Sequence, residues 1–198
     1  MTATRRVVLA TGNAGKQREF AALLAPRGFE LVLQTTLGIE AVDETGSTFE
    51  ANALLKARHA ARVASLPALS DDSGLEVDAL DGRPGVWSAR YAGPDATDAA
   101  NNALLLHELR SVPPAQRRAR YRCVIAWVRH ADDPMPLIAT GDWKGTIALQ
   151  PLGEGGFGYD PLFIPDGLRI TAAAMSPADK NAVSHRGKAL ASLLQLLP

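Results

Sequence analysis

The chain has little cysteine, no excess of charge of either sign, and no long apolar run. Cys123 is its only cysteine, which excludes a framework of internal disulfide bonds. Its 21 basic residues equal its 21 acidic ones, which argues against a basic face that neutralises a nucleic-acid backbone but leaves room for a small polyanion in a local cationic pocket. No stretch approaches a membrane span, and Met1–Arg6 leads into only a short apolar run. We therefore expect no nucleic-acid partner, no membrane partner and a cytoplasmic location.

What remains is the composition of a folded domain. The chain has 198 residues, of which 46% are apolar, enough for one domain with a sizeable core. We therefore expect a single domain over residues 1–198 rather than a disordered chain. Cys123 stands in the largely apolar run Tyr121–Trp127, which favours a buried structural cysteine over a nucleophile.

The start of the chain has the pattern of an α/β sheet. The β-branched segment Arg6–Ala10 predicts a short buried strand that ends at a Thr-Gly-Asn break. Apolar residues at helical spacing predict a helix from about Gly15 to Pro26, and Gly28 marks its exit. Glu30–Gln34 alternates like a second strand. A strand, loop, helix and strand in this order open an α/β fold.

The rest of the chain continues with both kinds of element. Ser47 and Glu50 fit a capping box for a helix that runs to about Ala64. Ser176 followed by proline is a good N-cap for a last helical region, which reaches Leu197 with a possible break. The other predicted elements are a helix at Thr97–Val112 and strands at Pro67–Ser70, Arg118–Arg129, Pro136–Trp143 and Lys144–Gln150.

The segment Thr11–Lys16 follows the first predicted strand. A strand, a glycine-containing turn and a helix N-terminus form a phosphate-binding geometry, because the helix start presents unpaired N–H groups and partial positive charge. Gly12 and Gly15 allow close backbone approach, and Lys16 adds a point charge. The glycine spacings of a Walker loop and of a dinucleotide fingerprint are both absent. A tight turn with an Asn13 N-cap and a solvated lysine fits the same residues, and this segment alone slightly favours that alternative.

Carboxylates gather at two places in the chain. Asp71 and Asp72 follow the predicted strand Pro67–Ser70, and Asp43 and Glu44 lie in a polar loop. Mg²⁺ takes oxygen ligands, usually one or two carboxylates together with substrate phosphates. Neighbouring strand residues point to opposite faces, so we expect one of the aspartates to be a metal ligand and the other a structural acceptor. A turn or a helix cap is the alternative for such a pair.

A late segment combines glycines with aromatic residues. Four glycines lie within residues 153–158 and surround Phe157. Such density suits a backbone that approaches a ligand, and the aromatic ring offers a stacking surface for a base. His185 and Arg186 add directional donors, and Lys180 could reach phosphate or base. The alternatives are a mobile surface loop and a solvated His-Arg pair.

Taken together, these motifs closely resemble the inosine/xanthosine triphosphate pyrophosphatase family, also called the Ham1/RdgB type. The resemblance covers nearly the whole chain and depends on matching segments that occur in the family's order. These segments are Leu9–Lys16, Glu44–Phe49, Asn52–Ala57, Asp71–Leu75, Pro84–Tyr91, Phe157–Pro161 and Ser184–Arg186.

The resemblance implies a fold, a reaction and a set of site residues. The fold would be an elongated mixed sheet flanked by helices, with two lobes and the active site in a cleft between them, in a homodimer. The reaction would be Mg²⁺-dependent cleavage of ITP, dITP and XTP to the monophosphate and pyrophosphate, which cleanses the nucleotide pool. Asp72 would be the catalytic proton acceptor, and Asp43 and Asp72 would hold the metal. The substrate-binding residues would be Thr11, Gly12, Asn13, Ala14, Gly15, Lys16, Ser73, Phe157, Gly158, Tyr159, Asp160, Lys180, His185 and Arg186.

Simple chemistry then suggests the roles of these groups. Water would attack the α-phosphorus, and Mg²⁺ with Lys16 would offset charge on the departing pyrophosphate. An ordinary aspartate is a weak base at neutral pH, so Asp72 would orient a metal-activated water rather than remove a proton unaided. Hypoxanthine and xanthine carry a carbonyl at C6 where adenine carries an amine, and we predict that Arg186 donates to this carbonyl.

Two departures from the family pattern and two rival functions remain. Ala51 stands where many relatives carry Glu, so no carboxylate role is assigned there, and Trp87 replaces a more usual Tyr. One rival is a Maf-type nucleotide pyrophosphatase, against which the segments Phe157–Asp160 and His185–Arg186 argue. The other is a non-catalytic nucleotide sensor, which would bind ITP without releasing pyrophosphate.

Overall fold

The computed structural model describes residues 5–197 as an open six-stranded mixed sheet flanked by helices, which confirms the predicted fold class. The strand order is β2-β1-β3-β4-β5-β6; β1 runs parallel to β2 and β3, whereas β5 and β6 are antiparallel. The strands are β1 (Arg5–Leu9), β2 (Phe29–Leu33), β3 (Ala68–Val77), β4 (Arg118–Val128), β5 (Leu137–Ile147) and β6 (Phe163–Pro165). The helices are α1 (Ala14–Leu24), α2 (Phe49–Ala64), α3 (Asp98–Glu108), α4 (Pro177–Val183) and α5 (His185–Leu196).

The chain forms two compact units. Unit 1 comprises Met1–Asp72, Cys123–Gly141 and Arg186–Pro198, and unit 2 comprises Ser73–Arg122 and Asp142–His185. The prediction of one functional domain over residues 1–198 stays a prediction, and Met1 to Thr4 and Pro198 lie outside the described residues.

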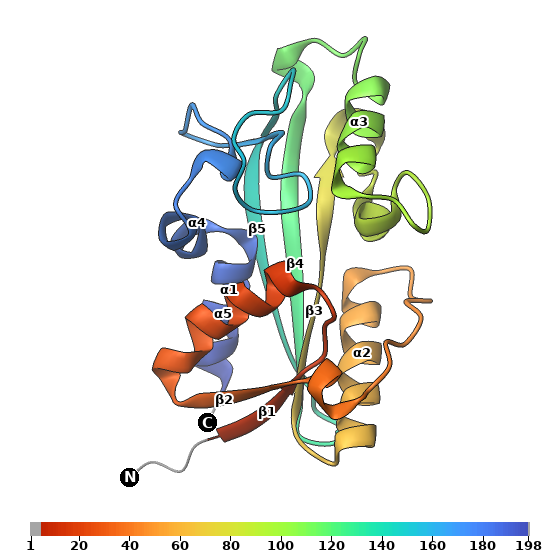
Figure 1. Ribbon diagram of the computed structural model, residues 1–198, viewed down its shortest axis with the longest axis vertical. Coiled ribbons are helices and arrows are strands. Elements are labelled where there is room, and N and C mark those ends of the chain that lie inside the picture. Colours follow the sequence, from red (N-terminus) through yellow and green to blue (C-terminus); the bar gives the residue numbers. More distant parts are fainter. Residues whose placement is uncertain (1–4, 198) are drawn as a thin grey trace. The chain divides into compact units, whose positions relative to one another are not determined.

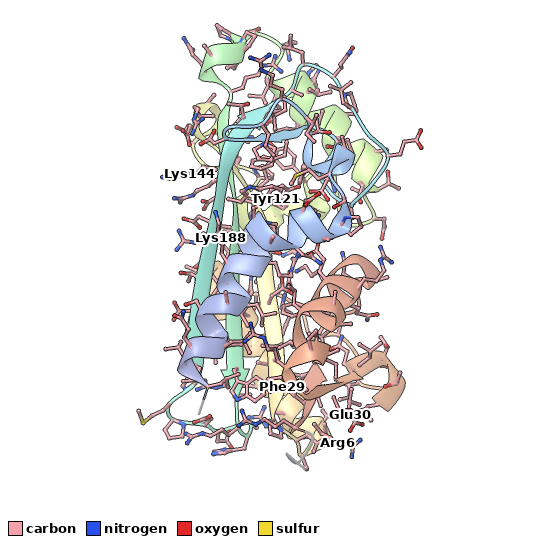
Figure 2. The ribbon with its side chains drawn as sticks, turned by 90° about the vertical axis from the view of Figure 1, so that its left-hand side faces the viewer. Arg6, Phe29, Glu30, Tyr121, Lys144 and Lys188 are labelled. Atoms are coloured by element: carbon pink, nitrogen blue, oxygen red, sulfur yellow. The ribbon has the colours of Figure 1, made fainter. Side chains whose placement is uncertain are left out.

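Unit 1 is built around the parallel strands at the start of the chain. Helices α1 and α5 lie on one side of these strands and α2 on the other (Figure 1). The core on the first side includes Phe20 of α1 and Leu190 of α5, and Phe29 of β2 meets Trp127 edge to face at 5.7 Å. Figure 2 shows Arg6 and Glu30 side by side on the paired strands β1 and β2, where Arg6 Nε lies 3.3 Å from Glu30 Oε1.

Unit 2 has a second core that is rich in aromatic rings. Leu75 of β3 and Leu105 of α3 belong to it, together with Tyr121, Trp143 and Phe163. The rings of Tyr121 and Phe163 meet edge to face with their centroids 4.8 Å apart, and the ring centroids of Trp143 and Phe163 are 5.2 Å apart. This packing fixes one end of the late glycine-rich segment, because buried Tyr159 is part of the same cluster.

Several helix boundaries follow the capping residues in the sequence. Asn13 Oδ1 accepts the Lys16 N–H at 3.0 Å, so α1 begins one residue earlier than predicted. Ser176 caps α4 as predicted, since its Oγ accepts the Asp179 N–H at 3.1 Å. The predicted break in the last helical region lies at Ser184, between α4 and α5.

The main correction concerns β3, which was predicted to end at Ser70 but runs to Val77. Asp71 and Asp72 therefore lie within the strand rather than at its end. Their carboxylates are tolerated in a buried strand because positively charged groups from helices distant in the sequence neutralise them. Strand propensity, which disfavours Asp and Gly, carries no information about such partners.

Smaller corrections concern three other elements. Thr48 rather than Ser47 caps α2, because Thr48 Oγ1 accepts the Ala51 N–H at 3.1 Å, so the predicted capping box is wrong. The predicted strands Pro136–Trp143 and Lys144–Gln150 are one strand, β5. α3 ends before its predicted C-terminus, and β6 is too short to show a sequence pattern of its own.

The prediction for the single cysteine is met within the described residues. Cys123 is a free, fully buried cysteine, as expected of a structural residue. Among residues 5–197, no helix combines the length and the apolarity that crossing a membrane requires.

Candidate functional site

The segment Thr11–Lys16 joins β1 to α1 in unit 1. Thr11 Oγ1 accepts the Asn13 N–H at 3.2 Å, and the Gln17 side-chain amide donates to the Thr11 carbonyl at 3.0 Å, so both ends of the turn are held. A Cβ at Gly12 would meet no protein atom within 4 Å, so open space adjoins the backbone there. The Asn13 cap of the alternative interpretation is present, and it is compatible with a phosphate-binding helix start.

Lys16 differs from the solvated lysine of that alternative. Its side chain is only 14% exposed, and Nζ lies 3.1 Å from Asp71 Oδ2. The solvated-lysine prediction is therefore wrong. The contact holds the ammonium at the buried Asp71 carboxylate of β3, so Lys16 is fixed within unit 1.

Asp71 is the centre of a buried cluster of charges. Arg186 donates to Asp71 Oδ2 from Nη2 at 2.9 Å and from Nε at 3.3 Å, and its Nη1 contacts Glu19. Both Asp71 and Arg186 are almost completely buried. Burial alone would favour the neutral acid, but Lys16 and Arg186 outweigh it and hold the pKa of Asp71 well below its usual range. Asp71 thus accepts contacts from two cations, whereas its expected role as the structural acceptor of the pair stays a prediction.

Asp72 faces the opposite side of β3, as strand alternation requires. Asn52 of α2 donates to Asp72 Oδ2 at 3.0 Å, and Lys56 Nζ lies 3.4 Å from Asp72 Oδ1. Asn52 also accepts the Gly46 N–H at 2.8 Å, which ties the preceding loop to the same place. Burial raises the pKa of Asp72, and Lys56 only partly opposes this effect. The environments of the two adjacent aspartates therefore shift their pKa values in opposite directions.

Glu44 is the second carboxylate at this place. Lys56 Nζ contacts both Glu44 Oε1 and Asp72 Oδ1, so one ammonium lies between two carboxylates. Burial opposes the charge on Lys56, but Asp72 and Glu44 outweigh it and raise its pKa. The neighbouring Asp43 is exposed, whereas Glu44 is half-buried. Of the two candidates in this loop, Glu44 is the one whose side chain the structure connects to Asp72.

The carboxylates of Asp72 and Glu44 suit a cation whose coordination shell is completed by the substrate and water. Within residues 5–197, no group of three or more His, Cys, Asp or Glu side chains could hold a metal ion by itself. Asp72 and Glu44 supply two carboxylates around a site now neutralised by Lys56. Because Mg²⁺ commonly takes one or two carboxylates and completes its shell with water and substrate phosphates, these residues fit it.

Unit 2 contains the late glycine-rich loop. Asp160 Oδ2 accepts the Phe157 N–H at 2.8 Å and a charged hydrogen bond from Lys180 Nζ at 2.6 Å. The same ammonium lies 4.8 Å from the centre of the half-buried Phe157 ring. At Gly156, a Cβ would lie 2.1 Å from Asp160 Oδ2, so only glycine allows this close approach. The sequence signal of dense glycine is thus explained by a folded loop.

His185 and Tyr159 are anchored in the aromatic core of the same unit. Tyr121, labelled in Figure 2, stacks on His185 with ring centroids 4.6 Å apart and planes inclined by 8°. Tyr159 donates from its hydroxyl to the Ser88 carbonyl at 2.8 Å. His185 is only 4% exposed, so the solvated-surface alternative for His185 and Arg186 is wrong. Ser73, also of unit 2, is a half-buried strand residue.

The predicted site residues therefore form two groups. The phosphate loop, Asp43, Asp72 and Arg186 belong to unit 1, and Ser73, the loop Phe157–Asp160, Lys180 and His185 belong to unit 2. Arg186 lies against acidic side chains, a partner that sequence reasoning does not anticipate. The sequence analysis also missed Asn52 and Lys56, although their spacing of four residues on a predicted helix places them on one face.

A model of the Ham1 family matches residues 7–196. The chain belongs to the Ham1 family. A protein of *Shigella flexneri* described as a dITP/XTP pyrophosphatase is 55% identical over 193 residues, which cover 98% of each chain. The corresponding protein of *Escherichia coli* strain K12, with the same description, is 54% identical over the same share of both chains.

Solved structures of Ham1 proteins have the same fold. A HAM1 protein from *Coxiella burnetii* is 46% identical and superposes with a TM-score of 0.87 over 97% of this chain and 96% of its own. A structure from *Mycobacterium abscessus*, titled nucleoside-triphosphatase / dITP/XTP pyrophosphatase, is 44% identical with a TM-score of 0.75 over 98% of both chains. The fold described above is thus that of the Ham1 family.

Proposed function

We propose that this Ham1-family chain hydrolyses ITP, dITP and XTP to the nucleoside monophosphate and pyrophosphate, with Mg²⁺, and so cleanses the nucleotide pool. One observation carries the proposal: consecutive aspartates on β3 face opposite ways. Asp71 holds Lys16 of the phosphate loop, and Asp72 shares Lys56 with Glu44. A triphosphate-binding cation and a metal-binding carboxylate pair are thus linked through one strand. Relatives that are 54–55% identical and described as dITP/XTP pyrophosphatases support the same reaction.

The phosphate end of the substrate is assigned to unit 1. The N–H groups of Thr11–Lys16 and the Lys16 ammonium would bind the triphosphate. Asp72 is the first proposed metal ligand, and the shared Lys56 favours Glu44 over the originally predicted Asp43 as the second. Bound Mg²⁺ would offset negative charge on the phosphates and lower the pKa of a coordinated water.

Asp72 is the proposed proton acceptor. Asp71 is locked as a carboxylate by Lys16 and Arg186, so Asp72 is the aspartate of the pair to which we assign the proton of a metal-bound water. Asn52 and Lys56 contact one oxygen each, so the carboxylate has a defined orientation. Asp71 and Asp72 have different proposed roles because their side chains lie on opposite faces of the strand.

The base end is assigned to the loop of unit 2. Phe157 would stack on the purine, and Ser73, Gly158, Tyr159, Asp160, Lys180 and His185 would complete the contacts. Donors aimed at a C6 carbonyl are left unpaired by adenine, which disfavours ATP. Arg186 remains a proposed contributor to base recognition, and its ion pairs with Asp71 and Glu19 add a role in positioning Lys16.

A homodimer and a cytoplasmic location complete the proposal. Both are supported by the family resemblance, and neither depends on a particular residue of the site.

The experiment that tests the function is a panel of nucleotides assayed for pyrophosphate with and without Mg²⁺. We expect release from ITP, dITP and XTP, slow release from ATP and GTP, and identification of the monophosphate as second product. Binding of ITP without any pyrophosphate release would instead support a nucleotide sensor. Preference for modified pyrimidine or methylated nucleotides would support a Maf-type enzyme.

A further inference from the structure

Gly158 of the glycine-rich loop is bound on both sides of its backbone by α3. Asp98, the first residue of the helix, accepts the Gly158 N–H through Oδ2 at 2.7 Å. Asn102, one turn later, donates from Nδ2 to the Gly158 carbonyl at 2.8 Å. All three residues belong to unit 2. One helix face therefore satisfies the donor and the acceptor of a single loop residue.

The orientation of the Asn102 amide is determined by its partners. Nδ2 donates to two carbonyl oxygens, those of Asp98 and Gly158, each at 2.8 Å. A flipped amide would turn its oxygen towards these oxygens, so the assignment is unambiguous. The buried Oδ1 consequently has no hydrogen-bond partner among the described residues. A buried polar atom without a partner is unfavourable, so packing alone does not explain an asparagine at position 102.

The loop needs such restraint because its backbone is unusual. Gly156 and Gly158 have φ of +74° and +62°, on either side of Phe157. Glycine reaches these angles readily but loses much conformational entropy when it is fixed in them. At Gly158 a Cβ would meet only the Tyr121 hydroxyl, at 4.0 Å, so side-chain crowding does not hold the residue in place. The bonds to Asp98 and Asn102 supply the restraint that packing lacks.

Helix capping does not explain Asp98. Thr97 is the N-cap of α3, and its Oγ1 accepts the Ala100 N–H at 3.2 Å. The Asp98 carboxylate is left to face the loop, and it is exposed. The two neighbours therefore divide the work, with Thr97 stabilising the helix and Asp98 binding the loop.

We propose that Asp98 and Asn102 are positioning residues that fix Gly158, and with it the ring of Phe157, for contact with the purine base. This inference rests on the proposed function of the loop as the base-binding element. Neither residue touches substrate in this scheme; both act through the backbone of Gly158. The consequence is that they influence affinity for the base and leave the binding of phosphate groups unaltered.

Asp98→Ala tests the inference, with inosine monophosphate and inorganic pyrophosphate as probes. We expect KM for dITP and Kd for inosine monophosphate to rise about tenfold, the effect of losing one hydrogen bond to a charged group, with kcat changed much less. Inhibition by pyrophosphate should be unchanged. Asp98→Asn keeps an acceptor for the Gly158 N–H and should restore most of the affinity.

Thr97→Ala is the matched control. It removes the cap of the same helix next to Asp98 and makes no change to the bonds of Gly158. It should lower the melting temperature and leave Kd for inosine monophosphate unchanged. A rise in Kd equal to that of Asp98→Ala would mean that helix fraying, and not the lost bond, moves the loop, which would overturn the inference.

Asn102→Leu provides a second test. The leucine removes both bonds that Nδ2 donates, to the carbonyls of Gly158 and Asp98, together with the unpartnered Oδ1. We expect weaker binding of inosine monophosphate together with a modest fall in melting temperature, because the loss of two hydrogen bonds is only partly offset by the loss of the buried unsatisfied Oδ1. Lower stability with unchanged nucleotide affinity would show a purely structural role and overturn the proposal.

Hydrogen exchange of the Gly158 amide separates this inference from the proposed function. The exchange should be slow in the wild-type chain and at least tenfold faster in Asp98→Ala, whether or not the protein hydrolyses purine triphosphates. Equal exchange in both proteins overturns the restraint itself. If exchange is faster in Asp98→Ala but the wild-type chain does not bind inosine monophosphate, the restraint of Gly158 is real and its role in base binding is overturned. The nucleotide panel tests the proposed function separately.

Discussion

At the scale of single residues, Asp71 and Asp72 show how strand alternation gives neighbouring side chains different surroundings. They are adjacent in the sequence, yet the contacts of Asp71 are with Lys16 and Arg186, whereas those of Asp72 are with α2. Lys16 and Arg186 hold the pKa of Asp71 well below its usual range, whereas burial raises the pKa of Asp72. The burial of both makes substitutions at this pair informative about function and about stability.

Asp72→Asn should reduce kcat for dITP by roughly 10²-fold or more, because it removes the charge and the proton acceptor with little change of shape. The melting temperature should remain close to that of the wild type. Pyrophosphate release at saturating Mg²⁺ is the measurement. A variant that keeps most of its activity would contradict the assignment of Asp72.

Arg186→Ala should destabilise the fold by about 3–5 kcal/mol, because it removes the guanidinium that the buried Asp71 and the half-buried Glu19 share. Urea unfolding measures the change. Arg62→Ala is the control: its ion pair with Asp132 is exposed, so its loss should be at most about 1 kcal/mol.

The same variant tests the base contact predicted for Arg186. If the guanidinium also donates to the C6 carbonyl, the ratio of kcat/KM for ITP to that for ATP should narrow in the folded variant. Full stability together with a narrowed ratio would assign Arg186 to the base and contradict its role in the ion pairs.

At the scale of elements, short polar connections hold the strands in register. In the connection between β4 and β5, Asp133 accepts hydrogen bonds from the Arg129 backbone and guanidinium and from the Met135 N–H. The Arg129 guanidinium is the main cause that holds the pKa of Asp133 below its usual range. This turn therefore contributes stability that depends on pH.

Asp133→Asn should destabilise the protein at pH 7 by about 1–3 kcal/mol, since it weakens several bonds to one buried carboxylate. The folded-state pKa lies below the unfolded value of about 4, so the wild-type advantage is complete above that value and declines as pH falls through the folded-state pKa. Urea midpoints at pH 7, 5 and 3.5 measure it. The control Asp132→Asn, at a side chain 88% exposed, should have almost no effect at any pH.

At the scale of the whole molecule, the two units divide the proposed site residues. Unit 1 contains the groups assigned to phosphate and metal together with Arg186, and unit 2 contains the loop residues assigned to the base. Neither unit carries, among its described residues, a set of protein ligands sufficient for a structural metal ion. The two proposed metal ligands, Asp72 and Glu44, already share Lys56 without a metal, so we predict that the metal serves the reaction and not folding.

Removal of divalent metal by a chelator should therefore abolish pyrophosphate release, and added Mg²⁺ should restore it. The melting temperature of the substrate-free protein should change by less than about 3 °C, which corresponds to ~1 kcal/mol for a chain of this length. Calorimetry with and without the chelator provides the comparison. A large loss of stability would indicate a structural metal and contradict the two-carboxylate site.

The sequence by itself determined the family, the α/β class, the caps Asn13 and Ser176, and the motifs that would bind a nucleotide, because these depend on local pattern and on the order of segments. Only the tertiary structure decided that β3 continues through Asp71 and Asp72, that Arg186 pairs with Asp71 and Glu19, and that Gly158 is bound by Asp98 and Asn102. The contacts of Arg186 and Gly158 join residues far apart in the chain, and so do the contacts of Asp71 and Asp72 with Lys16 and Lys56. A buried charge or a strained loop is stabilised by partners whose distance in space no local pattern encodes.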